Sequence, residues 1–117
     1  MHAFDVLGDP VRRRILELLA EREHASGEVV DVIAREFGIT QAAVSQHLKV
    51  LRESGFATVR PAGTRRLYTL DTTPMRDVDE WLDRFRVFWN HKLEALATDV
   101  ARGKKVRGRA SEPDTET

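Results

Sequence analysis

The feature that most constrains this chain is a very short break between two amphipathic helical patterns. Apolar residues recur at helical spacing up to Phe37, Gly38 ends that pattern, and Thr40 is suited to cap a second helix over 40–54. Ile39, between the two helices, is expected to be a buried plug. Two helices joined by a turn of three or four residues that contains Gly are typical of a helix-turn-helix. The sequence therefore predicts that motif.

Two further helices precede the motif. Residues 3–7 form a short apolar pattern that ends at Gly8. The pair Asp9-Pro10 then supplies an N-cap and a proline at the first helical position, which predicts a second helix ending near Arg22. Ser26 is the expected N-cap of the third helix.

The segment after Gly55 predicts a wing and one long helix. Residues 56–60 and 67–70 favour strands and flank Pro61-Ala62-Gly63-Thr64, which is typical of a hairpin. A helical stripe then runs from Pro74 to about Ala101. The predicted fold class is mainly α with a small β-hairpin, a winged helix-turn-helix domain over residues 1–101. Residues 102–117, basic and then acidic, are predicted to be a disordered tail.

Composition excludes several classes of protein. The 117 residues leave room for one domain, and the absence of cysteine excludes disulfides, thiolate metal sites and a cysteine nucleophile. No apolar run approaches the roughly 18 residues of a membrane span, so we expect a cytoplasmic protein with no membrane partner. No Gly-rich phosphate loop and no paired nucleophile and base are present. An enzyme is therefore the least expected class, and no cofactor is predicted.

Charge is unevenly distributed although the formal net charge is zero. Residues 41–66 carry five basic side chains and one acidic side chain, a net charge of +4, whereas residues 1–40 and 67–101 each carry −3. This segment contains the second helix of the motif together with the first strand and the turn of the wing. A cationic segment within an otherwise mildly acidic chain predicts an oriented contact with a polyanion.

Helical geometry separates two faces of the helix over 40–54, because each residue advances about 100° around the axis. Val44, Leu48 and Leu51 fall on the face that should be buried. The opposite face suits a DNA major groove, since glutamine can bond to adenine, alanine can touch a thymine methyl group and lysine can reach guanine or phosphate. A merely solvated face, with ordinary surface arginines in the wing, is the alternative. The residues predicted to contact DNA are Thr40, Gln41, Ala42, Ser45, Gln46, His47, Lys49 and Arg52 in this helix, and Arg60, Arg65 and Arg66 in the wing.

His47 and Glu53 occupy different positions around the predicted helix. Glu53 lies on the outer face with Ala42, Gln46 and Lys49, whereas His47 lies between the two faces and next to the buried stripe. We therefore expect His47 to make a structural hydrogen bond or a phosphate contact rather than to read a base.

Three motifs together carry a specific resemblance. Residues 9–16 (DPVRRRIL), 44–51 (VSQHLKVL) and 63–70 (GTRRLYTL), with Gly55 after the second motif, resemble the ArsR/SmtB family of bacterial winged-helix repressors over roughly residues 3–101. The resemblance implies a homodimer that represses transcription by occupying a promoter on double-stranded DNA and leaves it on an effector signal. It carries a DNA-contact role most directly to Gln41, Ala42, Ser45, Gln46 and Lys49. The effector is unknown.

The C-terminal helix predicts a homodimer in which the terminal helices form the interface. A helix of 28 residues would extend about 42 Å, more than a core of this size needs. Large exposed aromatic faces normally mark a subunit interface, although an intramolecular core is the alternative. The predicted interface residues are Phe4, Leu7, Trp81, Phe85, Phe88 and Trp89. A two-fold dimer would bind an imperfect palindrome.

A metal site is not predicted. Family members that sense arsenic or lead use cysteines, which this chain lacks, and other members bind zinc, nickel or cobalt between paired C-terminal helices. The loosely similar residues here are Asp77, Asp79, His91 and Glu94. The second acid stands where the family site has a histidine, and acids at a helix start also interact favourably with the helix dipole. A metal- or small-ligand-responsive repressor that uses the C-terminal helix remains the alternative, as does a protein-interaction module that does not read DNA.

Overall fold

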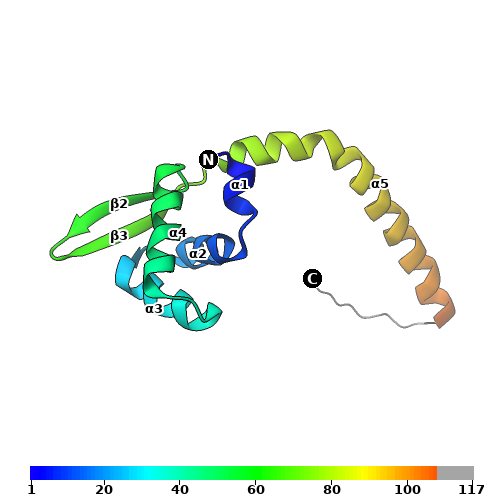
Figure 1. Cartoon of the computed structure of the whole chain (residues 1–117). Helices are drawn as coiled ribbons and strands as arrows, with labels where there is room; N and C mark the ends of the chain where they lie inside the picture. Colours follow the sequence, from blue (N-terminus) through cyan, green and yellow to red (C-terminus); the bar gives the residue numbers. More distant parts are fainter. Residues whose placement is uncertain (108–117) are drawn as a thin grey trace. The chain divides into compact units, whose positions relative to one another are not determined.

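The computed structural model describes the backbone of residues 1–107 and the side chains of residues 1–101 (Figure 1). The chain divides into two compact units, Met1–Asp79 and a second unit that begins at Glu80. In chain order the elements are α1 (Ala3–Leu7), α2 (Pro10–Glu21), β1 (His24–Ala25), α3 (Ser26–Phe37), α4 (Gln41–Glu53), β2 (Ala57–Ala62), β3 (Arg65–Leu70) and α5 (Met75–Arg107). The mainly helical architecture with a hairpin confirms the predicted fold class.

Side-chain caps fix where α2 and α4 begin. The Asp9 carboxylate accepts hydrogen bonds from the backbone N–H groups of Val11 at 2.8 Å and Arg12 at 3.3 Å. The Thr40 hydroxyl accepts one from Ala43 N at 3.0 Å. Each bond satisfies an N–H group that has no partner within its own helix. Both caps were predicted from the sequence.

The predicted cap of α3 was wrong. Ser26 is the first helical residue and Ala25 takes the N-cap position, where its N–H donates to Glu28 Oε1 at 2.9 Å. The reason is long-range, because Ala25 is held in an extended conformation by pairing with Leu67 in β3. The extended residue before a helix is the one that caps it, so the pairing of β1 moves the cap by one position.

One hydrophobic core lies between the helices and the sheet of the first unit. Its largest completely buried side chains are Val6, Ile15, Val29, Ile33, Val44, Leu51 and Phe56. Ile39, the predicted plug of the turn, is half-buried and packs against this core. Gly38 has φ 63° and Gly55 has φ 83°, conformations that favour glycine and let the chain leave α3 and α4 sharply.

The sheet is antiparallel with strand order β1-β3-β2. The wing strands are longer than predicted, because Ala62 pairs with Arg65 and only Gly63 and Thr64 remain in the turn. Pro61, predicted to lie in the turn, is part of β2. It fits there because β2 is an edge strand, where a residue without an N–H group is tolerated.

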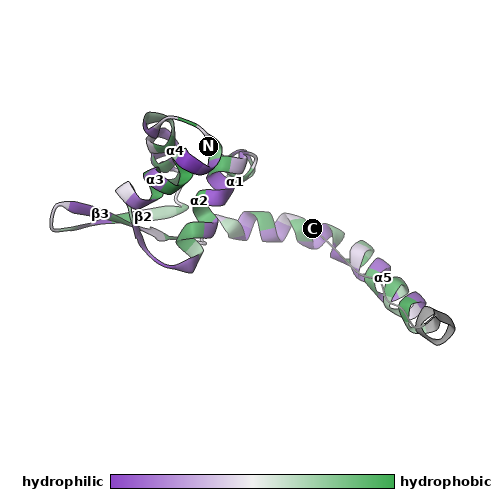
Figure 2. Ribbon diagram, turned by 90° about the horizontal axis from the view of Figure 1, so that it is seen from below, coloured by the Kyte–Doolittle hydropathy of each residue, from purple (hydrophilic) through white to green (hydrophobic). Residues whose placement is uncertain are grey.

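Helix α5 runs to Arg107, beyond the end near Ala101 that the periodicity predicted. Lysine and arginine are good helix formers and interact favourably with the C-terminal end of a helix dipole, so apolar periodicity alone places the end too early. The rest of the predicted tail, residues 108–117, lies outside the described residues. Apolar and polar residues alternate along α5 (Figure 2). None of the helices in the described part of the chain is long and apolar enough to span a membrane.

Candidate nucleic-acid interface

Helix α4 has one buried face and one exposed face, as its sequence predicts. Val44, Leu48 and Leu51 are buried in the core. The exposed residues of α4 are Gln41, Ala42, Ser45, Gln46, Lys49 and Glu53. The outer face therefore offers two amides, a hydroxyl, a methyl group, an ammonium group and, near its end, a carboxylate. The buried face holds the helix on the body.

His47 lies on the edge of this face and contacts the body. Its Nδ1 is 3.4 Å from Arg12 Nη1 in α2. Because the guanidinium only donates, the imidazole nitrogen accepts in this contact. His47 thus has the structural hydrogen bond that its position suggested. Thr40, another predicted contact, uses its hydroxyl to cap α4.

Strand register places the three wing arginines on two faces of the hairpin. Directly paired residues project to the same face, and successive residues alternate between faces. Arg66 is paired with Pro61 and lies two positions from the buried Tyr68, so these three residues share the face that continues from the core. Arg65 and Arg60 occupy the opposite face.

Acidic residues of the body pair with the arginines on that opposite face. The Arg60 guanidinium binds the Glu23 carboxylate through Nη2 at 2.9 Å and Nε at 3.2 Å. Arg65 Nη2 lies 3.6 Å from Glu28 Oε1. Sequence reasoning placed both arginines in the DNA-contacting set and missed their partners, because the two members of each pair lie in distant parts of the chain.

These contacts keep both glutamates ionised. Hydrogen bonds from Arg60, followed by that from the Thr69 hydroxyl, hold the pKa of Glu23 below its usual value despite partial burial. The Ala25 N–H lowers the pKa of Glu28, and the charges of Arg22 and Arg65 add to this effect. Two wing cations are therefore neutralised by carboxylates.

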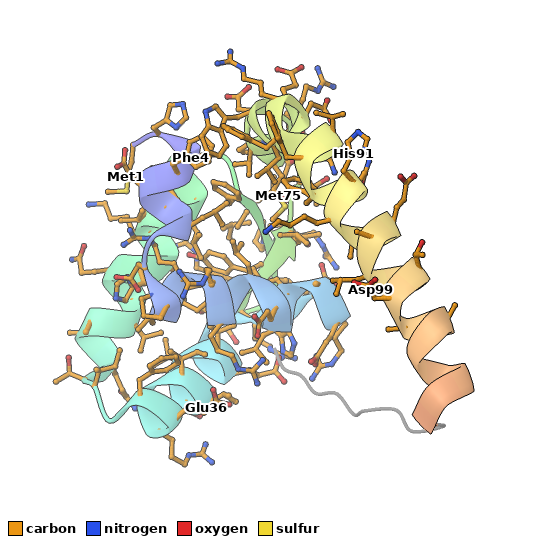
Figure 3. The ribbon with its side chains drawn as sticks, turned by 90° about the vertical axis from the view of Figure 1, so that its right-hand side faces the viewer. Met1, Phe4, Glu36, Met75, His91 and Asp99 are labelled. Carbon is orange, nitrogen blue, oxygen red and sulfur yellow. The ribbon has the colours of Figure 1, made fainter. Side chains whose placement is uncertain are left out.

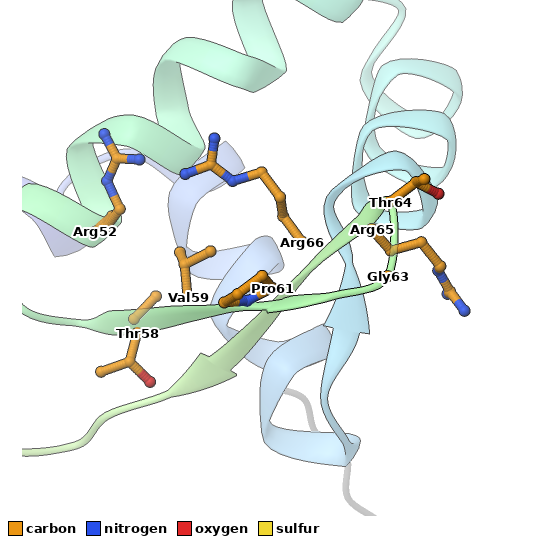
Figure 4. Close-up of a pocket in the computed structure, with 9 residues that line it drawn as sticks. Arg52, Thr58, Val59, Pro61, Gly63, Thr64, Arg65 and Arg66 are labelled. Carbon is orange, nitrogen blue, oxygen red and sulfur yellow. The ribbon is translucent and has the colours of Figure 1, made fainter.

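A concavity of about 700 Å³ lies between the end of α4 and the wing. Figure 4 shows Arg52 of α4 and Arg66 of β3 pointing to the same side of the hairpin, whereas Arg65 points away from them. Neither Arg52 nor Arg66 has an ion pair within the side chains that the structure describes. Arg65 also lines the concavity but is paired with Glu28, so Arg52 and Arg66 supply its positive charge that carboxylates do not neutralise.

Comparison with known proteins identifies the family. The sequence model described as bacterial regulatory protein, arsR family, matches residues 9–59. The HTH-type transcriptional regulator Rv2034 of Mycobacterium tuberculosis is 43% identical over 95 residues, which are 81% of this chain and 82% of that protein. The chain belongs to the arsR family. It is accordingly a DNA-binding transcriptional regulator.

The chain is also similar to a transcriptional repressor and to a solved structure of a possible regulator. The transcriptional repressor SdpR of Bacillus subtilis is 31% identical over 84 residues, covering 72% of this chain and 89% of that protein. A crystal structure described as a possible transcriptional regulator for arsenical resistance matches with a TM-score of 0.59 and 33% identity, covering 85% of this chain and 96% of that one. The similarity therefore extends well beyond α4.

The residues considered for a metal site do not cluster in one chain of this arsR-family protein. Asp77, Asp79, His91 and Glu94 all lie on α5. Met75 marks the start of α5, and His91 and Asp99 lie farther along it (Figure 3). Within the side chains described, no three His, Asp or Glu residues come together in a metal-binding arrangement.

The predicted dimer residues of this arsR-family protein are largely exposed. Phe4 in the first unit, and Trp81, Phe85 and Phe88 in the second, are exposed, whereas Leu7 and Trp89 are half-buried. Within α5 the ring centroids of Trp81 and Phe85 lie 4.7 Å apart. The guanidinium carbon of Arg86 lies 5.5 Å from the centroid of the Trp89 ring. Further exposed apolar side chains that the interface prediction did not include are Val87, Leu93, Leu96 and Val100.

Proposed function

We propose that this chain is a homodimeric repressor that occupies a palindromic operator, with α4 in the major groove and the wing against the adjacent backbone. The observation that carries the proposal is the exposed face of α4 beside the concavity lined by Arg52 and Arg66. A helix fits the major groove, and an adjacent cationic surface meets the phosphates that flank it. We further propose that the protein works in the cytoplasm, where bacterial DNA lies. We assign it no catalytic role.

The side chains of α4 divide between base reading and phosphate binding. Gln46 reads a base edge, because an amide donates and accepts together, and Ala42 allows close approach to a thymine methyl group. Lys49 binds guanine or phosphate. Arg52 and Arg66 bind phosphates, which position the protein on the duplex without specifying sequence.

Dimerisation supplies the second half-site contact. Aromatic side chains exposed along α5 would cost free energy in water, and a second copy of the chain buries them. A two-fold pair of α4 helices would read half-sites one helical turn apart, about 34–36 Å. The operator is therefore expected to be an imperfect palindrome.

Genome-wide mapping of bound sites followed by footprinting tests this proposal. We expect a short protected palindrome that is lost in the double variant Gln46→Ala, Lys49→Ala. The control is Glu21→Ala, an exposed residue at the end of α2 and outside the predicted DNA-contacting set, which should leave the footprint unchanged. Only weak, sequence-independent binding by the parent protein at physiological salt would reject the proposal.

A further inference from the structure

One carboxylate joins the body of the first unit to both strands of the wing. Glu23 precedes β1 and accepts from Arg60 of β2 through both carboxylate oxygens, at 2.9 Å and 3.2 Å. Its Oε2 also accepts from the Thr69 hydroxyl of β3 at 3.2 Å. The donors are 37 and 46 residues away in sequence. No other ion pair in the described side chains links β2 to the body.

The geometry distinguishes this contact from an ordinary surface ion pair. Exposed pairs contribute about 0–1 kcal/mol because two long side chains must be held in one arrangement. Here the guanidinium and carboxylate meet through two parallel hydrogen bonds, which adds directional restraint, and a third donor fixes the carboxylate. Glu23 is only 35% exposed at its side chain, although Arg60 is 60% exposed.

We propose that Glu23 is a positioning residue that sets the orientation of the wing and withholds Arg60 from the phosphate backbone. This inference rests on the proposed function, because it assigns the phosphate contacts of the wing to the Arg66 face alone. Glu28 supports the same arrangement by facing Arg65 at 3.6 Å. Two carboxylates thus neutralise the arginines on one face of the hairpin, which weakens the attraction of that face for phosphate.

The salt dependence of DNA binding shows which face of the wing contacts phosphate. Each phosphate contact contributes a slope of about −0.9 to a plot of log binding constant against log salt concentration on duplex DNA. On a mixed-sequence duplex, Arg66→Gln should reduce the magnitude of the slope by about 0.9 for each wing in contact, and Arg60→Gln should leave it unchanged. An equal reduction in both variants would overturn the proposal.

Wing orientation can be measured without DNA by attaching labels to introduced cysteines. The chain has no cysteine of its own, so only the introduced positions are labelled. Spin labels on cysteines at Thr64, in the wing turn, and Glu21, on α2, report the distance between wing and body by pulsed electron resonance. We expect Glu23→Gln and Arg60→Gln to broaden the distance distribution, and the exchanged pair Glu23→Arg with Arg60→Glu to narrow it again. A distribution unchanged by Glu23→Gln would overturn the proposal.

The matched control is Glu36→Gln. Glu36 forms a similar two-bond pair with Arg14, at 3.0 Å and 3.2 Å, but contacts no part of the wing. Its removal should change neither the salt slope nor the label distances. If the parent protein fails to bind duplex DNA, the proposed function fails while the label measurement still decides the role of Glu23.

Discussion

Arg12 Nη1 lies 3.4 Å from His47 Nδ1, and this contact joins α2 to α4. The same guanidinium donates to two backbone carbonyls of α1, Val6 O at 3.0 Å and Asp5 O at 2.8 Å. Its side chain is only 12% exposed. One arginine therefore ties together the N-terminal helix, the helix that follows it and the helix proposed to enter the major groove.

Arg12→Gln should destabilise the protein. The shorter amide cannot reach all three helices, and hydrogen bonds from a charged, half-buried donor contribute about 1.5–3 kcal/mol. Urea unfolding of Arg12→Gln should show a decrease in the free energy of unfolding within this range. Arg35→Gln is the control, because Arg35 is exposed and makes one hydrogen bond within α3, so it should change stability by less than about 0.5 kcal/mol. Equal losses in the two variants would contradict the role given to Arg12.

Ionisation of Asp9 should make the free energy of unfolding decrease at acidic pH. Burial raises its pKa, but hydrogen bonds from the Arg12 and Val11 backbone N–H groups outweigh burial, and the charge of Arg12 adds to them, so the pKa is lowered. A carboxyl group with a lower pKa in the folded state contributes stability above its unfolded pKa of about 3.9. That contribution is lost as the pH falls through the folded pKa.

Asp9→Asn isolates this titration, because asparagine caps a helix but does not ionise. The difference in unfolding free energy between the parent and Asp9→Asn should shrink as the pH is lowered below about 4. Urea titrations at several pH values measure it. A difference that is independent of pH would show that the ionisation of Asp9 does not contribute.

Substitutions at Leu48 and Gln46 in α4 should have different effects on stability and on DNA binding. Leu48 is 2% exposed in the core, and Leu48→Ala should cost about 2–5 kcal/mol of stability. Gln46→Ala, on the outer face, should leave stability within about 0.5 kcal/mol of the parent. It should nevertheless lose about 1–3 kcal/mol of discrimination between operator and mutated operator, as measured by competition binding. Loss of stability without loss of discrimination would place Gln46 outside the interface.

Phe88→Glu should produce a monomer. Phe88 is 67% exposed in the single chain, so the substitution removes little intramolecular burial but places a charge in the proposed interface. Sedimentation equilibrium should show dissociation together with weaker operator binding. Asn90→Glu, an exposed polar position on α5, carries the same charge and should remain dimeric. A dimeric Phe88→Glu protein would move the interface away from this face.

The parts of the fold that depend on local spacing could be predicted from the sequence. The two faces of α4 follow from the helical period, and the caps at Asp9 and Thr40 follow from their side chains. Strand β1 could not be predicted, because two residues have no periodicity and His24 and Ala25 are strand residues only through pairing with β3. The cap of α3 was misplaced for the same reason.

The arrangement of the wing arginines could not be predicted from the sequence. Composition identifies Arg60, Arg65 and Arg66 as one cationic group, but only the register of β2 against β3 places them on two faces. The partner of Arg60 is likewise invisible in sequence, because Glu23 lies 37 residues away. Residue types predict the surface that is proposed to meet DNA, whereas the division of its arginines between two faces follows only from the pairing of the strands.

Pro61 has a consequence for how copies of this protein behave beside one another. Strand β2 is the outer strand of the sheet, and an outer strand with unpaired N–H and C=O groups is a template on which another chain can add a strand. Proline removes one of the donors that such growth needs. The wing can therefore stay uncovered, as DNA recognition requires, while resisting aggregation with the wings of other molecules.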